Sequence, residues 1–173
     1  MTDPASDPAA PAAAFARHDH GRCVATARAS VEAACAERGL RLTPARARVL
    51  EILLDSHQAL GAYDVLERLR AGGHPAQPPV AYRALDFLVA NGFAHRIEKL
   101  NAFVACVHPD EGAAPRHDPA FMICRECRRV AETSAGPAAA SVADAARDLG
   151  FEVERTVVEI EGVCPDCRRK AAR

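Results

Sequence analysis

Hydrophobic residues in the first half of the chain recur every three or four positions, which is the spacing of one helical face. Four helices are therefore predicted, over residues 24–39, 42–54, 61–73 and 80–92. In the second helix, Thr43 can cap the first free amides and Pro44 suits the first helical position. A glycine marks the end of each of the other three helices.

Two short runs typical of strands follow the fourth predicted helix. They predict strands over Phe93–Glu98 and Ala102–Cys106, with a turn near Leu100 and Asn101. Several helices followed by a hairpin is the order of a winged helix-turn-helix, in which the helix over 80–92 would read DNA.

The predicted reading helix has one apolar stripe and one polar side. The stripe consists of Ala81, Ala84, Leu85 and Leu88. Tyr82 and Arg83 then face outward, where an arginine can fork to guanine or phosphate and a tyrosine can contact a phosphate or a thymine methyl. The pattern alone also allows a small helical bundle whose arginines are simply solvated.

The second half carries two Cys-x-x-Cys pairs, Cys124 with Cys127 and Cys164 with Cys167. A helical stretch and an alternating run over 151–162 lie between them, and the run predicts a long strand. A strand, helix and strand can bring the second pair beside the first, and four thiolates then close a tetrahedral zinc site. A dithiol redox pair and unrelated buried cysteines are the alternatives.

Four further donors remain outside this site: His95, Cys106, His117 and Glu132. Each alone has an ordinary explanation as a surface or core residue. Together they offer nitrogen, sulfur, nitrogen and oxygen, a four-coordinate zinc set. Two come from the predicted hairpin and two from beyond the loop over 109–119, so a metal held this way would tie the two halves together. His108 is an alternative donor close to Cys106.

A third group of donors, His18, His20 and Cys23, lies close to the N-terminus. Because it borders a segment predicted to be disordered, the favoured interpretation is weak or adventitious metal binding. Cys35 lies among alanines in the first predicted helix and is expected in the core.

Composition limits the kind of core and the kind of DNA contact. Hydrophobic residues make up 49% of the 173 residues but aromatic residues only 5%, so the core must consist of aliphatic side chains. The net charge is -1, so any DNA binding depends on a local basic patch.

The N-terminal stretch is rich in alanine, proline and aspartate and is predicted to be a disordered tail over residues 1–22. It lacks the features of a secretory signal, and no apolar stretch is long enough to span a membrane. A cytoplasmic location is therefore expected. Thiols stay reduced there, which favours metal ligation or burial over disulfides for the seven cysteines.

The motifs and their order along the chain resemble those of a known protein family. The succession RLTPARARVL, AYDVLERL, PPVAYRALDFLVANGFAHRIE, CRECRRVAE and CPDC resembles the ferric uptake regulator family, and most closely its zinc-sensing branch. The similarity covers about residues 24–170. Two motifs depart from the family pattern: Val80-Ala81 stands where a Thr-Val pair is usual, and Gly61 where a serine is usual.

The resemblance implies an α+β fold of two domains. A winged helix-turn-helix domain over 23–107 would bind DNA, and a small α/β domain over 120–173 would dimerise, with a hinge loop over 108–119. The resemblance further implies a homodimer on a palindromic operator, in which zinc acts as co-repressor of zinc uptake genes.

The resemblance also implies roles for individual residues. Two zinc ions per subunit are expected, one structural and one regulatory. The structural set is Cys124, Cys127, Cys164 and Cys167, and the regulatory set is His95, Cys106, His117 and Glu132. Tyr63, Tyr82 and Arg83 match positions that contact DNA.

Two other interpretations remain open. An iron- or peroxide-responsive regulator of the same family would share the fold, although the soft thiolate of Cys106 favours zinc. A thiol-redox or zinc-buffering protein would use the two cysteine pairs without binding DNA. An enzyme is not expected, because both predicted metal sites are closed by four protein ligands and leave no position for water or for a small-molecule substrate.

Overall fold

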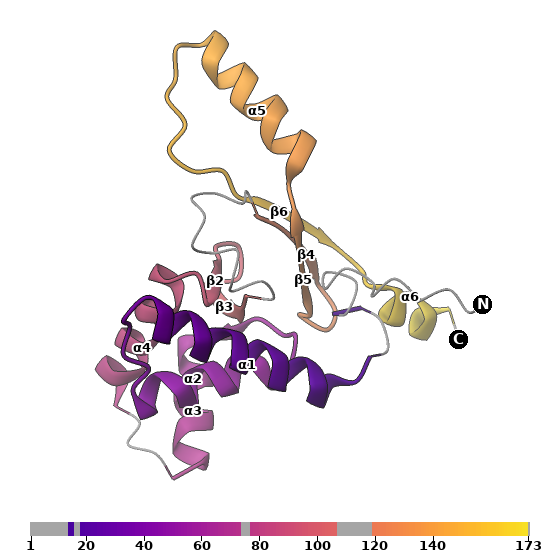
Figure 1. Ribbon diagram of the computed structural model, residues 1–173. Helices are drawn as coiled ribbons and strands as arrows, with labels where there is room; N and C mark the ends of the chain where they lie inside the picture. Colours follow the sequence, from indigo (N-terminus) through magenta and orange to yellow (C-terminus); the bar gives the residue numbers. More distant parts are fainter. Residues whose placement is uncertain (1–13, 16–17, 74–76, 107–118, 173) are drawn as a thin grey trace, which may run out of the picture.

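The computed structural model describes residues 14–15, 18–73, 77–106 and 119–172. The first half of this chain forms a bundle of four helices, as predicted (Figure 1). They are α1 (His20–Glu37), α2 (Pro44–Leu54), α3 (Ala62–Ala71) and α4 (Pro78–Ala90).

The helix starts follow from their capping residues. The Thr43 side chain accepts a hydrogen bond from the amide of Arg46, as the sequence predicts. The Asp19 side chain does the same for Arg22, so α1 begins at His20, inside the tail predicted over 1–22. Both prolines predicted to precede α4 lie within its first turn, where their missing amide hydrogens have no intrahelical role.

A three-stranded antiparallel sheet follows the helices and forms the wing. It consists of β1 (Leu60–Gly61), β2 (Ala94–Ile97) and β3 (Ala102–Ala105), in the order β1-β3-β2. Asn101 makes the turn between β2 and β3 with φ 45, a conformation that asparagine tolerates. The predicted winged helix-turn-helix order is thereby confirmed.

The core of this half is mainly aliphatic, as the composition predicts, but it also includes the buried rings of Phe93 and Phe103. Val49, Leu53, Leu85 and Leu88 are fully buried and join the helices to one another. Cys35 belongs to the same cluster, which confirms its predicted place in the core.

The second half contains an open sheet with two helices. Its elements are β4 (Pro119–Cys124), β5 (Val130–Ser134), α5 (Gly136–Asp148), β6 (Val158–Gly162) and α6 (Pro165–Ala171). The strand order is β5-β4-β6, with β6 parallel to β4, which is the return of the chain that the cysteine spacing predicts.

The long strand predicted over 151–162 is shorter in the structure. Its partner β4 begins at Pro119, which has no amide hydrogen to donate, and the pairing runs only from Ala120–Val158 to Cys124–Gly162. Residues 151–157 therefore form an irregular connection.

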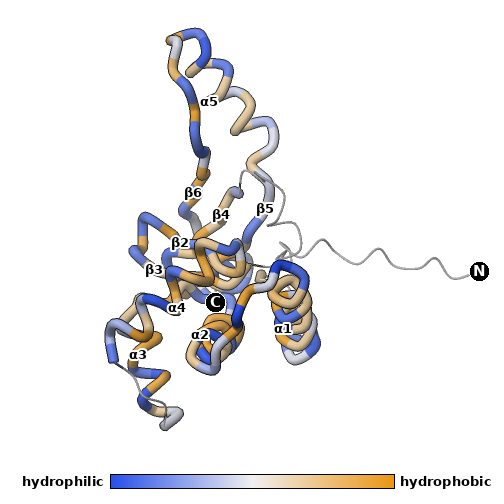
Figure 2. The backbone as a smooth tube through the Cα atoms, turned by 60° about the vertical axis from the view of Figure 1, so that its left-hand side comes forward, coloured by the Kyte–Doolittle hydropathy of each residue, from blue (hydrophilic) through white to orange (hydrophobic). Residues whose placement is uncertain are grey.

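Helix α5 stands away from the rest of the chain in both views (Figures 1 and 2). Ala139 is its only buried residue. Large apolar side chains remain exposed on α5, in the segment after it and on the sheet: Met122, Val142, Leu149, Phe151 and Ile160. None of the described helices is both long and apolar enough to cross a membrane.

The two halves meet along residues 57–59 and 128–130, which we call the cross-domain ladder. The amide of Val130 donates to the carbonyl of His57 at 2.8 Å, and the amide of Ala59 donates to the carbonyl of Arg128 at 3.1 Å. A small apolar cluster continues this contact, with Ile97 from the wing packed in the same group as Phe121 from β4.

Candidate metal centres and nucleic-acid interface

The two cysteine pairs converge at one end of the second sheet. Cys124 ends β4 and Cys127 lies in the following turn, while Cys164 caps α6 and Cys167 lies in its first turns. One sulfur from each of the four lies within 4.8 Å of the others. This set of four thiols is what a closed structural zinc site requires.

The local environment favours thiolate at Cys124 but disfavours it at Cys167. Burial alone would raise the pKa of the Cys124 thiol, but backbone hydrogen bonds, chiefly from Cys164 and Cys127, outweigh burial and lower this pKa to about 6. Desolvation, followed by hydrogen bonds with the neighbouring thiols, raises the pKa of Cys167 to about 12. Four adjacent thiols cannot all ionise unaided, so a divalent cation is the natural counter-charge.

Arg129 lies beside this cluster and contacts two of its sulfurs. Its Nε is 3.4 Å from Cys127 Sγ, and its Nη2 is 3.5 Å from Cys164 Sγ. The same Nη2 lies 2.6 Å from a carboxylate oxygen of Asp166, which holds the guanidinium in place. The arginine therefore offsets part of the charge of the thiolates from outside the ligand set.

We expect Arg129→Met to weaken zinc binding at the four cysteines by about 10- to 100-fold, the usual cost of losing a group that supports metal ligands. The measurement is zinc transfer to a chelator at increasing chelator concentration. Arg128→Met is the matched control, because Arg128 is adjacent and exposed. Equal zinc affinity in the two variants would show that the guanidinium contributes nothing to the site.

Three of the four predicted regulatory donors also come together. His95 on β2, Cys106 just after β3 and Glu132 on β5 each present one donor atom within 4.8 Å of the others. His95 Nε2 lies 2.9 Å from Glu132 Oε1. Glu132 is only 5% exposed and is the one buried charged residue of the described chain. Because a buried carboxylate requires a charged or strongly polar partner, this site suits a cation.

Backbone pairing explains why the two wing donors lie close together. The Cys106 amide donates to the Phe93 carbonyl at 3.0 Å and so extends the β2–β3 hairpin by one position. Glu132 is opposite Phe121 in the second sheet, and the Phe121 ring lies 5.1 Å from the His95 ring. The donors thus come from both halves of the chain, as the sequence predicts. His117 and the alternative His108 lie outside the described residues.

The predicted DNA-contacting side chains lie on the surface of the helical half. Tyr63 is 75% exposed and Tyr82 is 42% exposed, although side chains of this size and hydrophobicity are commonly buried. Arg83 is also exposed, with its Nε donating to the Pro79 carbonyl at 3.1 Å. The stripe predicted to face inward, of Ala81, Ala84, Leu85 and Leu88, is buried.

Comparison with known proteins identifies the family. The model of the ferric uptake regulator family matches residues 37–161. The chain belongs to the ferric uptake regulator family. It is 39% identical over 139 residues to the zinc uptake regulation protein of Escherichia coli strain K12, with 80% of each chain covered.

Among the solved structures, zinc uptake regulators superpose on the chain. A zinc uptake regulator complexed with zinc and DNA superposes with a TM-score of 0.78 at 35% identity, covering 91% of this chain and all of the other. Holo XcZur gives 0.74 at 42% identity, covering 84% and 99% of the two chains. Apo XcZur gives only 0.50, with 41% identity and coverage of 85% and 99%.

The structure adds two residues that the sequence analysis missed. Arg129 follows the first cysteine pair, but nothing in its sequence context distinguishes it from the neighbouring arginines. His57 lies beside His18, His20 and Cys23. Its separation from them in sequence left no spacing signal, since tertiary contact alone brings it there.

Proposed function

We propose that this ferric uptake regulator family member is a zinc-responsive, DNA-binding repressor of zinc uptake genes. The single observation that carries the proposal is the set of His95, Cys106 and Glu132, whose donor atoms lie within 4.8 Å of one another across the two halves. With His117 as the fourth ligand, the site would connect a domain over 23–107 to one over 120–173. The names of the relatives in E. coli and in the zinc–DNA complex support the same function.

Residues of the wing would transmit the effect of zinc to the reading helix. Phe93 lies in the short connection between α4 and β2. Its amide donates to the Leu88 carbonyl of α4 at 2.8 Å. The orientation of α4 therefore follows the position of His95 and Cys106. Holding both against Glu132 fixes α4 relative to the second half, and this half would set the spacing between two subunits.

The higher similarity to holo than to apo XcZur supports this interpretation. This chain superposes on holo XcZur with a TM-score of 0.74 and on apo XcZur with 0.50, although its sequence identity to the two is nearly equal. The chain as described here is therefore more similar to the holo state of that relative than to its apo state. We infer that zinc stabilises this arrangement here.

The donor chemistry favours zinc over iron. Cys106 is 2% exposed and offers a soft thiolate in a site otherwise composed of imidazole and carboxylate. Two zinc ions per subunit would occupy the two sets.

Apolar surface supports a homodimer. Leu149 is 85% exposed, Phe151 68% and Val142 55%, all in or next to α5, which buries a single alanine of its own. Exposed apolar patches of this kind mark protein interfaces. A two-fold dimer through this surface would place two α4 helices on the half-sites of a palindromic operator.

Arg83→Ala is expected to abolish specific operator binding while the fold and zinc content stay unchanged. A base or phosphate contact of this kind contributes about 1 to 3 kcal/mol, and a dimer loses two of them. Arg128→Ala is the matched control, because Arg128 is an exposed arginine of the second half that belongs neither to the proposed DNA surface nor to the proposed dimer surface. Fluorescence anisotropy with labelled operator DNA measures both affinities, and equal affinities would exclude α4 as the reading helix.

The proposed function is tested by titrating purified protein and promoter DNA with buffered zinc, ferrous iron or manganese. Gel shift should report two subunits per operator, and affinity should increase with free zinc. A response to iron alone would favour an iron sensor. Reactive thiols in zinc-loaded protein, with no DNA binding under any metal condition, would favour the thiol-redox alternative.

A further inference from the structure

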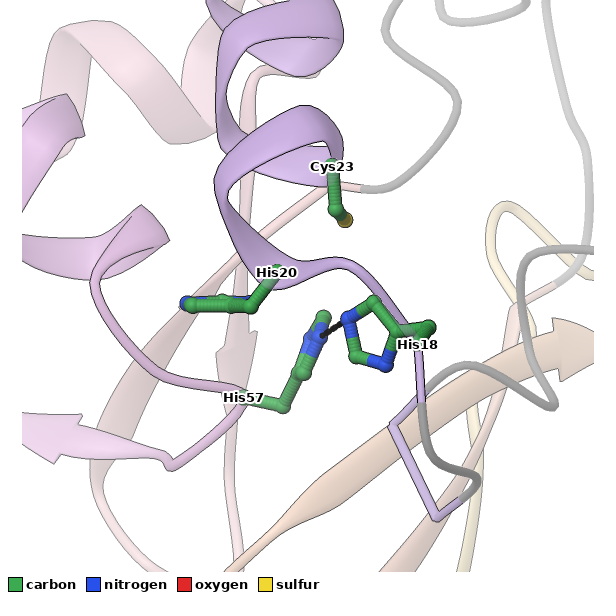
Figure 3. Close-up of side chains that lie close together, drawn as sticks. All are labelled: His18, His20, Cys23 and His57. Carbon is green, nitrogen blue, oxygen red and sulfur yellow. Dashed lines mark hydrogen bonds between the residues drawn. The ribbon is translucent and has the colours of Figure 1, made fainter.

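A third cluster of metal donors lies where α1 begins. His18, His20 and Cys23 are joined by His57 from the turn after α2, and one donor atom from each lies within 4.8 Å of the others (Figure 3). This cluster shares no residue with the two sets described above. We propose that His18, His20, Cys23 and His57 form a third zinc site, which fastens the start of α1 to the turn that precedes the cross-domain ladder.

The four side chains bring their donor atoms close enough together to surround one small ion. His57 Nε2 and His18 Nε2 are 3.1 Å apart. Ligand atoms around tetrahedral zinc are separated by about 3.4 Å, given metal–nitrogen distances near 2.1 Å. The ring centroids of His20 and His18 lie 5.1 and 5.0 Å from that of His57, and Figure 3 shows the Cys23 side chain on the side facing the His18 and His57 rings.

The hydrogen bonding of His20 prepares it as a ligand. Its Nε2 lies 2.8 Å from the backbone carbonyl of Asp55, which can only accept, so Nε2 carries the proton. In the neutral tautomer Nδ1 then carries the lone pair that can bind a metal, and this buried atom has no hydrogen-bond partner within the part of the chain that the structure describes. A carbonyl that fixes the histidine tautomer in this way is the usual companion of a metal-binding imidazole.

The donor set specifies the type of ion. Three imidazoles and one thiol match zinc, whereas carboxylate-rich sites suit magnesium, calcium or manganese. Neutral imidazole is the form that binds metals.

The place of the cluster in the fold indicates what such a site would do. The His57 carbonyl accepts the Val130 amide at 2.8 Å, so His57 itself belongs to the cross-domain ladder. On the other side of His18, the Ala14 carbonyl accepts a hydrogen bond from Arg129 Nη1 at 3.3 Å. Zinc at this position would therefore connect α1 to the segment that joins the two halves.

The test compares zinc content and local protection in full-length protein. After equilibration with buffered zinc, the wild-type chain should retain three zinc ions, and Cys23→Ser and His57→Ala should each retain two. Ser56→Ala, in the same turn as His57, is the control and should retain three. Amide hydrogen exchange over residues 18–24 should slow on zinc addition in wild type and in the control, but not in Cys23→Ser.

Two results would overturn the third site. One is that folded Cys23→Ser and His57→Ala proteins, checked by circular dichroism, hold as much zinc as wild type at every free zinc concentration. The other is zinc retention by the wild type only at concentrations that also load unrelated proteins, without protection of residues 18–24. Loss of zinc response in Cys106→Ser leaves this inference untouched, because the two ligand sets do not overlap.

Discussion

Cys124→Ser is expected to unfold the second half of the chain and to abolish operator binding. Cys124 is 1% exposed at the end of β4, and the sheet around it contributes few large buried side chains. Structural zinc contributes on the order of 10 kcal/mol to small domains of this type. That exceeds the stability of many whole domains, so loss of one ligand removes more than the remaining packing can offset.

Metal analysis, limited proteolysis and gel filtration measure this effect together. The variant should lose the four-cysteine zinc, become sensitive to protease beyond residue 119 and elute as a single chain. Cys35→Ala is the matched control: Cys35 is a buried thiol of the other half with no place in a ligand set. It should keep its zinc and its elution volume. A Cys124→Ser protein that resists protease as wild type does would show that this zinc does not hold the second half together.

Cys106→Ser is expected to leave a folded dimer whose DNA affinity no longer responds to zinc. The hydroxyl is a far weaker ligand than thiolate, so His95 and Glu132 would lose the cation that joins them. Coupling between two sites of this kind is typically about 1 to 3 kcal/mol, so the wild type should gain roughly 5- to 150-fold in operator affinity on zinc binding. The variant should gain almost nothing.

Two measurements make this result decisive. Anisotropy titrations at fixed low and high free zinc give the coupling from the operator side. Zinc titrations with and without operator DNA give it from the metal side, and by linkage the two values must agree in wild type. A variant that still follows zinc in both titrations would show that His108 or another donor outside the described residues binds the ion instead.

Much of the fold could be predicted from sequence, because its signals are local or regularly spaced. The same holds for the grouping of the four cysteines and for the closeness of His95 and Cys106. The two-residue spacing within each cysteine pair identifies the pairs in the sequence. The hairpin that carries His95 and Cys106 is predicted from two short strand-like runs on either side of a turn. The inward faces of α3 and α4 follow from helical periodicity, and their predicted residues are buried. In these cases the residues that decide the structure are near one another in the chain.

The predictions that differ from the structure depend on distant partners. The strand over 151–162 is shortened because β4 offers pairing only from Val158 onward, which no pattern within the run reveals. His57 joins His18 and His20 because α1 packs against α2. The residues that meet there are far apart in sequence: His20 contacts Asp55, 35 positions away, and His18 contacts His57, 39 positions away. The early start of α1 at His20 had a local signal, the Asp19 cap, which the alanine- and proline-rich surroundings obscured.

Helix α5 buries only one residue, Ala139, against its own chain. In the proposed assembly, most of the free energy that keeps Gly136–Asp148 ordered must then come from a neighbouring copy. Ordering of this helix and association of two chains become one event, so the melting temperature should increase as the protein is concentrated. At low cellular concentration more of the protein would be monomeric and would be degraded faster, since a monomer leaves Leu149 and Phe151 exposed.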